Sequence, residues 1–79
     1  MNSKVNLMFK LDNGIKYVIL KQAVYKNEDY YIASKLDHHN NPIADDITFF
    51  HQIDFNGQVK MEEVTDIKLM KYLYNYMQL

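Results

Sequence analysis

Hydrophobic and polar residues alternate near the start of the chain, as they do in a half-buried β-strand. In residues 4 to 11, KVNLMFKL, one face carries Val5, Leu7, Phe9 and Leu11. Asp12-Asn13-Gly14 follows and predicts a tight hairpin turn, because Asn and Gly tolerate the positive φ angles of such turns. We therefore expect the aromatic and β-branched run from Ile15 to Tyr25 to return beside the first strand.

The same alternation predicts three further strands, at residues 30–36, 47–53 and 58–64. The polar residues 26–29 predict a turn before the first of them, and Asn56-Gly57 predicts a hairpin turn before the last. Residues 37–46, DHHNNPIADD, predict a longer loop, since Asn41-Pro42 interrupts regular structure. In the last strand, Val59 and Met61 are expected to face inward.

A helix is predicted from Thr65-Asp66, which offers an N-cap, nearly to Leu79. At the helical period one broad stripe contains Leu69, Met70, Leu73, Tyr76 and Met77, and the opposite side contains Lys68, Lys71 and Asn75. This helix can cover one face of the sheet. The expected fold class is α+β, an antiparallel sheet of about five strands packed by one C-terminal helix, with the other face more open.

Length and composition narrow the classes of protein. The 79 residues make one domain, 1–79, and a chain this short buries only about 60% of its unfolded surface, which keeps a homodimer possible. A leader peptide and an apolar run long enough to span a membrane are both lacking, which predicts a cytoplasmic protein with no membrane partner. Net charge is −1 and every one of the nine cations is Lys, so no direct nucleic-acid binding is expected.

Candidate chemistry is sparse. Cysteine is absent, which excludes disulfides and thiolate metal sites. The metal-like cluster comprises Asp37, His38, His39, Asp45 and Asp46, with His51 further along. Adjacent residues in extended backbone point apart and no second anchoring motif follows, so these are interpreted as solvated loop residues and His51 as a hydrogen-bonded sheet residue. No phosphate loop or nucleophile motif is present, and we expect no enzyme, no catalytic residue, no metal and no cofactor.

Aromatic pairs are the remaining feature. Tyr30-Tyr31 and Phe49-Phe50 are each adjacent within a predicted strand, so one ring of each pair faces away from its neighbour. If the helix covers one face alone, two of these four rings are exposed or lie against a partner, and they form a possible interaction surface. The alternative is that a small sheet needs large residues on both faces.

The order of these elements resembles the YrzB-like family of small bacterial proteins, whose domain has no assigned function. The resemblance rests on LDNG, YVILKQAVYKNEDYYIAS, DDITFFHQIDFNGQ and EEVTDIKLMKYLYNYM. It implies an α+β fold and no catalytic residues. The expected strongly acidic character of family members does not carry over, because this chain is nearly neutral and rich in tyrosine.

These observations favour a non-enzymatic interaction or regulatory module that binds a cytoplasmic protein, or itself, through a sheet face or edge. An alternative is a small phage or mobile-element inhibitor that blocks a host macromolecular machine. A metal-responsive regulator that uses His38 and His39 is a third possibility.

Overall fold

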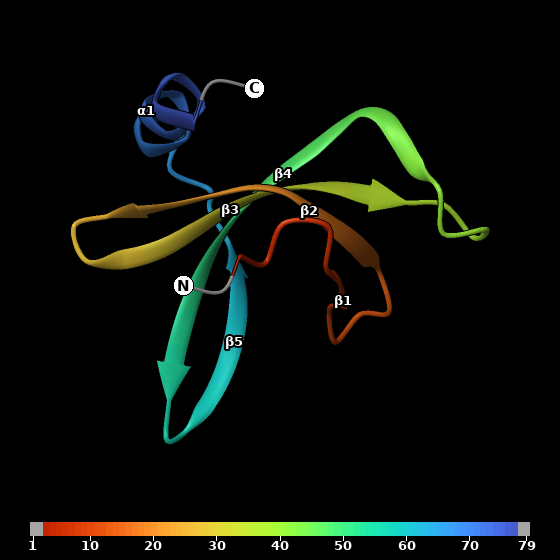
Figure 1. Ribbon diagram of the computed structural model, residues 1–79, viewed down its shortest axis with the longest axis horizontal. Coiled ribbons are helices and arrows are strands. Elements are labelled where there is room, and N and C mark those ends of the chain that lie inside the picture. Colours follow the sequence, from red (N-terminus) through yellow and green to blue (C-terminus); the bar gives the residue numbers. More distant parts are fainter. Residues whose placement is uncertain (1–2, 78–79) are drawn as a thin grey trace.

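Five antiparallel strands and one helix make up the computed structural model, which describes residues 3–77 (Figure 1). The elements are β1 (Met8–Lys10), β2 (Lys16–Tyr25), β3 (Glu28–Leu36), β4 (Pro42–Phe55), β5 (Gln58–Glu63) and α1 (Ile67–Met77). The sheet order is β1-β2-β3-β4-β5, so every strand pairs with its neighbours in sequence. The predicted α+β class, with a five-stranded antiparallel sheet and a C-terminal helix, is confirmed.

Tight turns join the strands where the sequence predicts them. Asn56-Gly57 has φ angles of 50° and 78°, and Lys26-Asn27 has 51° and 64°. Positive φ at two successive residues matches the right-handed twist of the flanking strands. The Lys26-Asn27 turn is shorter than predicted, because β3 already begins at Glu28. In the Asp12-Asn13-Gly14 turn, the Gly14 N–H donates to the Leu11 carbonyl oxygen at 2.9 Å.

An irregularity at Leu20 changes which face of the sheet β2 serves. Ile19 pairs with Ala33 and Lys21 pairs with Ile32, so Leu20 is an extra residue in this ladder. Such a bulge shifts the alternation of side chains by one position. Consequently Ile19 packs on one face of the sheet, whereas Ala23, four residues later, packs on the other.

The two faces of the sheet are covered in different ways. Beneath α1 lies the outer cluster, made of Tyr30, Ile32, Val64, Leu73 and Met77. The opposite face carries the inner cluster, made of Tyr17, Ile19, Tyr31, Ala33 and Phe50. The sheet curls around this second face, and the hairpin of β4 and β5 bends toward β1 (Figure 1). The expectation that the face opposite the helix would be more open is therefore wrong for these residues.

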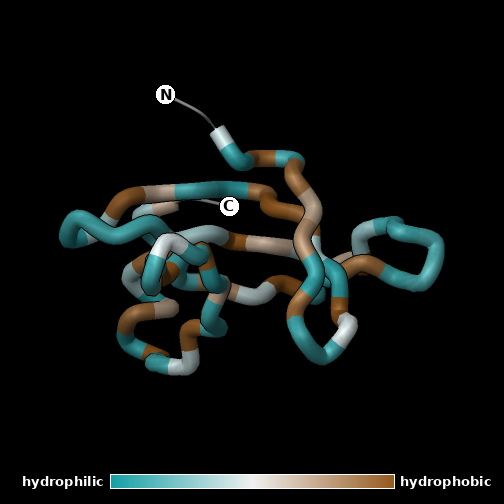
Figure 2. The backbone as a smooth tube through the Cα atoms, turned by 90° about the horizontal axis from the view of Figure 1, so that it is seen from below, coloured by the Kyte–Doolittle hydropathy of each residue, from teal (hydrophilic) through white to brown (hydrophobic). Residues whose placement is uncertain are grey.

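The start of the first strand and the start of β4 differ most from prediction. The first strand was expected over 4–11, but Asn6 has a φ of 74° and β1 is confined to Met8–Lys10. The loop expected over 37–46 is also shorter, because β4 begins at Pro42, which pairs with Leu36. Proline is tolerated at the first residue of a strand. The remaining loop projects from the body and is mostly hydrophilic (Figure 2).

Asp66 begins the helix as the sequence predicts. Its Oδ1 accepts hydrogen bonds from the backbone N–H groups of Lys68 at 2.9 Å and Leu69 at 3.3 Å. Leu73 and Met77 are buried, but Tyr76, predicted on the same stripe, is 55% exposed. The 11-residue helix ends at Met77, and the rest of the predicted helix lies outside the described residues.

Removing this cap should destabilise the fold measurably. Asp66→Ala leaves two backbone N–H groups of the first helical turn without their acceptor, so we expect a loss of about 1 kcal/mol in the free energy of unfolding. Urea denaturation followed by circular dichroism measures it. Asp66→Asn is the matched control, because Asn caps as well as Asp. A full loss in Asp66→Asn would show that the negative charge, and not the cap, is what stabilises the helix.

Candidate functional site

The four aromatic residues predicted as an interaction surface are mostly inside the molecule. Tyr30, Tyr31 and Phe50 are 6%, 2% and 0% exposed, and Phe49 is half-buried against the outer cluster. The alternation was correct, since the members of each pair face opposite sides. The expectation that two rings would be exposed or lie against a partner is wrong, because the curled sheet buries Tyr31 and Phe50 on its inner face. These residues belong to the core, and a candidate interaction surface lies elsewhere on the molecule.

Three aromatic rings hold β1 on the inner face. The Phe9 and Phe50 rings meet edge to face, with their centroids 5.0 Å apart, and Tyr17 approaches Phe50 in the same way at 4.8 Å. Phe9 also stacks on Tyr17 at 5.6 Å. Edge-to-face and offset stacked pairs are the favoured aromatic geometries. This triad fixes the short strand β1 opposite β5 across the inner face.

A groove of about 410 Å³ lies between β1 and β5. Its lining is mainly apolar with lysines among the polar members: Lys4, Leu7, Met8, Phe9, Lys10, Leu11, Asp12, Ile19, Val59, Lys60 and Met61. Several apolar side chains here face solvent, among them Met8 at 62% and Val59 at 59% exposed. The groove is the place where the first and last strands of the sheet, both edge strands, approach one another.

On β5 the backbone groups that face this groove follow from the ladder. The Val64 N–H donates to the Phe49 carbonyl oxygen at 2.8 Å. Because residues of an antiparallel edge strand alternate between bonding their neighbour and pointing away from it, Lys60 and Glu62 bond β4 as Val64 does. The N–H and C=O groups of Val59 and Met61 therefore point away from β4, toward the open side.

The same reasoning applies to β1. The Leu11 N–H donates to the Ile15 carbonyl oxygen, and the Ile19 N–H donates to the Leu7 carbonyl oxygen, both at 2.9 Å. The alternate residues, Met8 and Lys10, direct their backbone groups away from β2. Both of them line the groove, as Val59 and Met61 do. Two strand edges with outward-facing backbone donors and acceptors thus open on a single groove.

Lys4 anchors the segment before β1 across the inner face. Its backbone N–H donates to Gln22 Oε1 at 2.6 Å, and its Nζ donates to Gln52 Oε1 at 2.8 Å. The Tyr31 hydroxyl donates to the same Gln52 oxygen at 2.6 Å. Burial, followed by the charges of Asp29 and Asp54, raises the pKa of Tyr31 above its ordinary value. This network therefore holds a neutral phenol and one ammonium group at one end of the groove.

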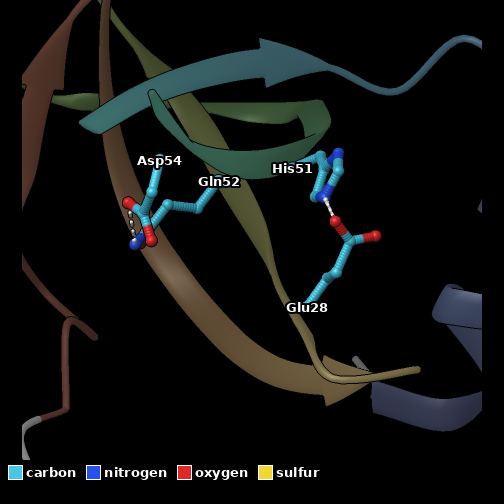
Figure 3. Close-up of polar contacts among 4 residues, drawn as sticks. All are labelled: Glu28, His51, Gln52 and Asp54. Atoms are coloured by element: carbon cyan, nitrogen blue, oxygen red, sulfur yellow. Dashed lines mark hydrogen bonds and ion pairs between the residues drawn. The ribbon is translucent and has the colours of Figure 1, made fainter. Parts of the chain in front are cut away.

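His51 lies on the other side of β4, away from the groove. Figure 3 shows His51 and its neighbour Gln52 pointing to opposite sides of the strand. The imidazole stacks on Tyr30 with centroids 4.6 Å apart, and its Nε2 lies 3.2 Å from Glu28 Oε1. Nε2 is buried and makes no hydrogen bond within residues 3–77, so the contact with Glu28 is electrostatic when the imidazole is protonated. In this arrangement His51 joins the β2–β3 hairpin to β4.

The histidine loop is organised by its own aspartate. Asp37 Oδ1 accepts hydrogen bonds from the backbone N–H groups of His39 at 2.8 Å and Asn41 at 2.9 Å. The His38 and His39 rings lie 4.0 Å apart between centroids and are both exposed. Within residues 3–77 no group of three or more His, Asp or Glu side chains is arranged to hold a metal ion. Asp37 shapes the turn through an oxygen that a metal would otherwise use.

Comparison with known proteins gives no relative: no family model, curated protein or solved structure matches this chain. The resemblance to the YrzB-like family therefore stays a prediction. Within residues 3–77, no helix has the length and apolar character needed to cross a membrane.

The groove residues were missed at the level of sequence. Alternation predicts Met8 and Lys10 on the polar side of the first strand, which gives no sign of a groove, and Lys60 is one lysine among nine. A usable signal was present in the order of elements. Consecutive hairpins make the first and last strands the edges of the sheet, and edges carry unpaired backbone groups.

Truncating a core aromatic side chain should strongly destabilise the protein. Phe50→Ala removes a fully buried ring that contacts Phe9 and Tyr17, and we expect a loss of about 3–5 kcal/mol in unfolding free energy. That is a large share of the stability of a small domain. Thermal melting compared with Phe55→Ala, where the native ring is 70% exposed, measures the difference. Equal losses in both variants would contradict the core assignment of Phe50.

Buried tyrosines should make the fold sensitive to alkali. Burial is the main cause that raises the pKa of both Tyr30 and Tyr31 above the ordinary value of 10.0. As pH rises past that value, the unfolded chain loses these protons first, so unfolding free energy should fall. Tyr31→Phe should flatten the fall seen in urea denaturation above pH 10.0. An unchanged slope in Tyr31→Phe would contradict the assignment.

Proposed function

We propose that the protein is a non-enzymatic interaction module that binds a protein through the strand edges of its sheet, at the groove between β1 and β5. The observation that carries this proposal is that outward-facing backbone groups of four residues open on one groove: Met8, Lys10, Val59 and Met61. An extended segment laid along either edge would satisfy those donors and acceptors. This mode of recognition takes its affinity from main-chain hydrogen bonds and its specificity from flanking side-chain contacts.

The side chains of the groove support the same proposal. Phe9, Leu11 and Met61 are partly buried against the inner cluster and form an apolar floor. Phe9 belongs to the aromatic triad, and Leu11 and Met61 pack against the inner cluster, so a binding segment meets a largely ordered floor. Preorganisation of this kind lowers the entropic cost of association.

A second exposed apolar region lies on α1 and offers less to a partner. Ile67 and Tyr74 are 65% and 52% exposed and line a hollow of about 330 Å³. The backbone groups in the middle of a helix are already hydrogen-bonded, so this region presents side chains alone. It serves as a control surface for the groove.

A proline at an outward-facing backbone position tests the proposal. Val59→Pro removes an N–H that points away from β4 and leaves the β4–β5 ladder intact, which an edge strand tolerates. We expect the free energy of unfolding to change by less than about 1 kcal/mol. Partners are recovered with the wild-type protein from its native host, identified by mass spectrometry and purified. Each of them should bind Val59→Pro at least about tenfold more weakly than wild type.

Two controls accompany this variant. Tyr74→Ala alters the exposed helix region and should leave the purified partner's affinity unchanged. Lys60→Pro removes an N–H that bonds β4, so it should lower the melting temperature where Val59→Pro does not. A partner that binds Val59→Pro as tightly as wild type, but loses affinity for Tyr74→Ala, would move the binding surface to the helix and overturn the proposal.

A further inference from the structure

The groove between β1 and β5 is positively charged although the whole protein has a net charge of −1. Three lysines line it, Lys4, Lys10 and Lys60, against a single carboxylate, Asp12. Among residues 3–77 none of these lysines forms an ion pair, since the ion pair present there joins His51 and Glu28. An occupant that brings negative charge is therefore complementary to the groove.

The strand directions define how an extended occupant fits. Four antiparallel pairings separate β1 from β5, so these two strands run in the same direction. One further strand between them, running the opposite way, would be antiparallel to both neighbours. It would satisfy the outward backbone groups on either side, as closure of a barrel does.

The alternation of side chains on β1 and β5 also defines what the side chains of that strand would meet. On the inner side they would lie beside Phe9 of β1 and Met61 of β5, which both pack on the inner cluster. On the outer side they would lie beside Lys10, the neighbour of Phe9, and beside Lys60 and Glu62, which share the outer face of β5. Since successive residues of a strand alternate between faces, inner positions favour apolar side chains and outer positions favour carboxylates.

We infer that the groove binds an extended protein segment in which apolar residues alternate with Asp or Glu, and that this segment inserts as a strand between β1 and β5. The inference rests on the proposed function. The apolar residues cover Phe9 and Met61, and the acidic residues pair with Lys10 and Lys60. The same lysines repel basic strands, which gives the edge a selectivity that backbone hydrogen bonding alone lacks.

Three capped heptapeptides of equal length test this inference, with valine alternating with glutamate, glutamine or lysine. Their affinities for the full-length protein are measured by fluorescence polarisation at low and high salt. We expect the glutamate peptide to bind at least about tenfold more tightly than the lysine peptide. High salt should reduce that preference. The double variant Lys10→Glu/Lys60→Glu should invert it.

Backbone hydrogen exchange provides a second readout on the wild-type protein, which is independent of whether any variant folds. Binding of the glutamate peptide should slow exchange at the amides of Met8, Lys10, Val59 and Met61, because these groups become hydrogen-bonded. Val59→Pro should lower the affinity of every peptide that binds along the strand edges. Protection confined to α1 would overturn the inference and the proposed function together.

The remaining outcomes separate the two levels of the proposal. Peptides that bind, protect the strand edges and lose affinity in Val59→Pro, but show no preference for glutamate, would overturn the inference and leave the proposed function standing. Light scattering that shows a wild-type dimer, dissociated by Val59→Pro, would identify a second copy as the occupant and also overturn it. Sodium dodecanoate, an anionic amphiphile with no peptide backbone, probes the groove for a ligand that is not a protein. If it binds in the groove and no peptide does, the inference and the proposed function are both overturned.

Discussion

One extra residue in β2 allows a single strand to contribute to both cores of this protein. Up to Ile19 the strand turns its large side chains toward the inner cluster, and after Leu20 it turns Ala23 and Tyr25 toward the helix. A regular strand would place Ile19 and Ala23 on the same face, so one cluster would lose its contribution from β2. The bulge also increases local twist, which is consistent with the curl of the sheet around the inner face. The groove depends on that curl, because it brings β5 opposite β1.

Coverage of both faces explains the abundance of tyrosine and phenylalanine. A chain of 79 residues has one short helix with which to cover a five-stranded sheet, and the second face is covered by the sheet itself. Large rings can fill such a thin interior, and tyrosine hydroxyls find partners near its ends, as Tyr31 does with Gln52. The tyrosines of β2 and β3 are therefore chiefly walls of the two cores, and the candidate binding surface lies at the strand edges.

Local patterns predicted much of the fold. Alternation located four strands and the β-branched, aromatic run located β2, while Asn56-Gly57 marked its turn and Asp66 the start of the helix. Each of these signals depends on residues close in sequence. The extent of coverage could not be predicted in the same way. Whether Phe50 is exposed depends on Phe9, forty-one residues away, and on a bulge that no turn residue announces. The groove could not be predicted for a related reason. Its outward-facing donors and acceptors belong to the backbone, and which residues direct them outward depends on which residues of each edge strand bond the neighbouring strand.

The two walls of the groove differ in how firmly they are held. β5 pairs with β4 over six residues, whereas β1 pairs with β2 over three, and the preceding segment is held by Lys4 and a few backbone bonds. Local opening has the lowest free energy where the fewest bonds must break together. Fluctuations of the native state should therefore begin in the three-residue pairing of β1, where the Phe9 ring still packs on Tyr17 and Phe50. The groove has one rigid side and one yielding side, and its width is set by the yielding one.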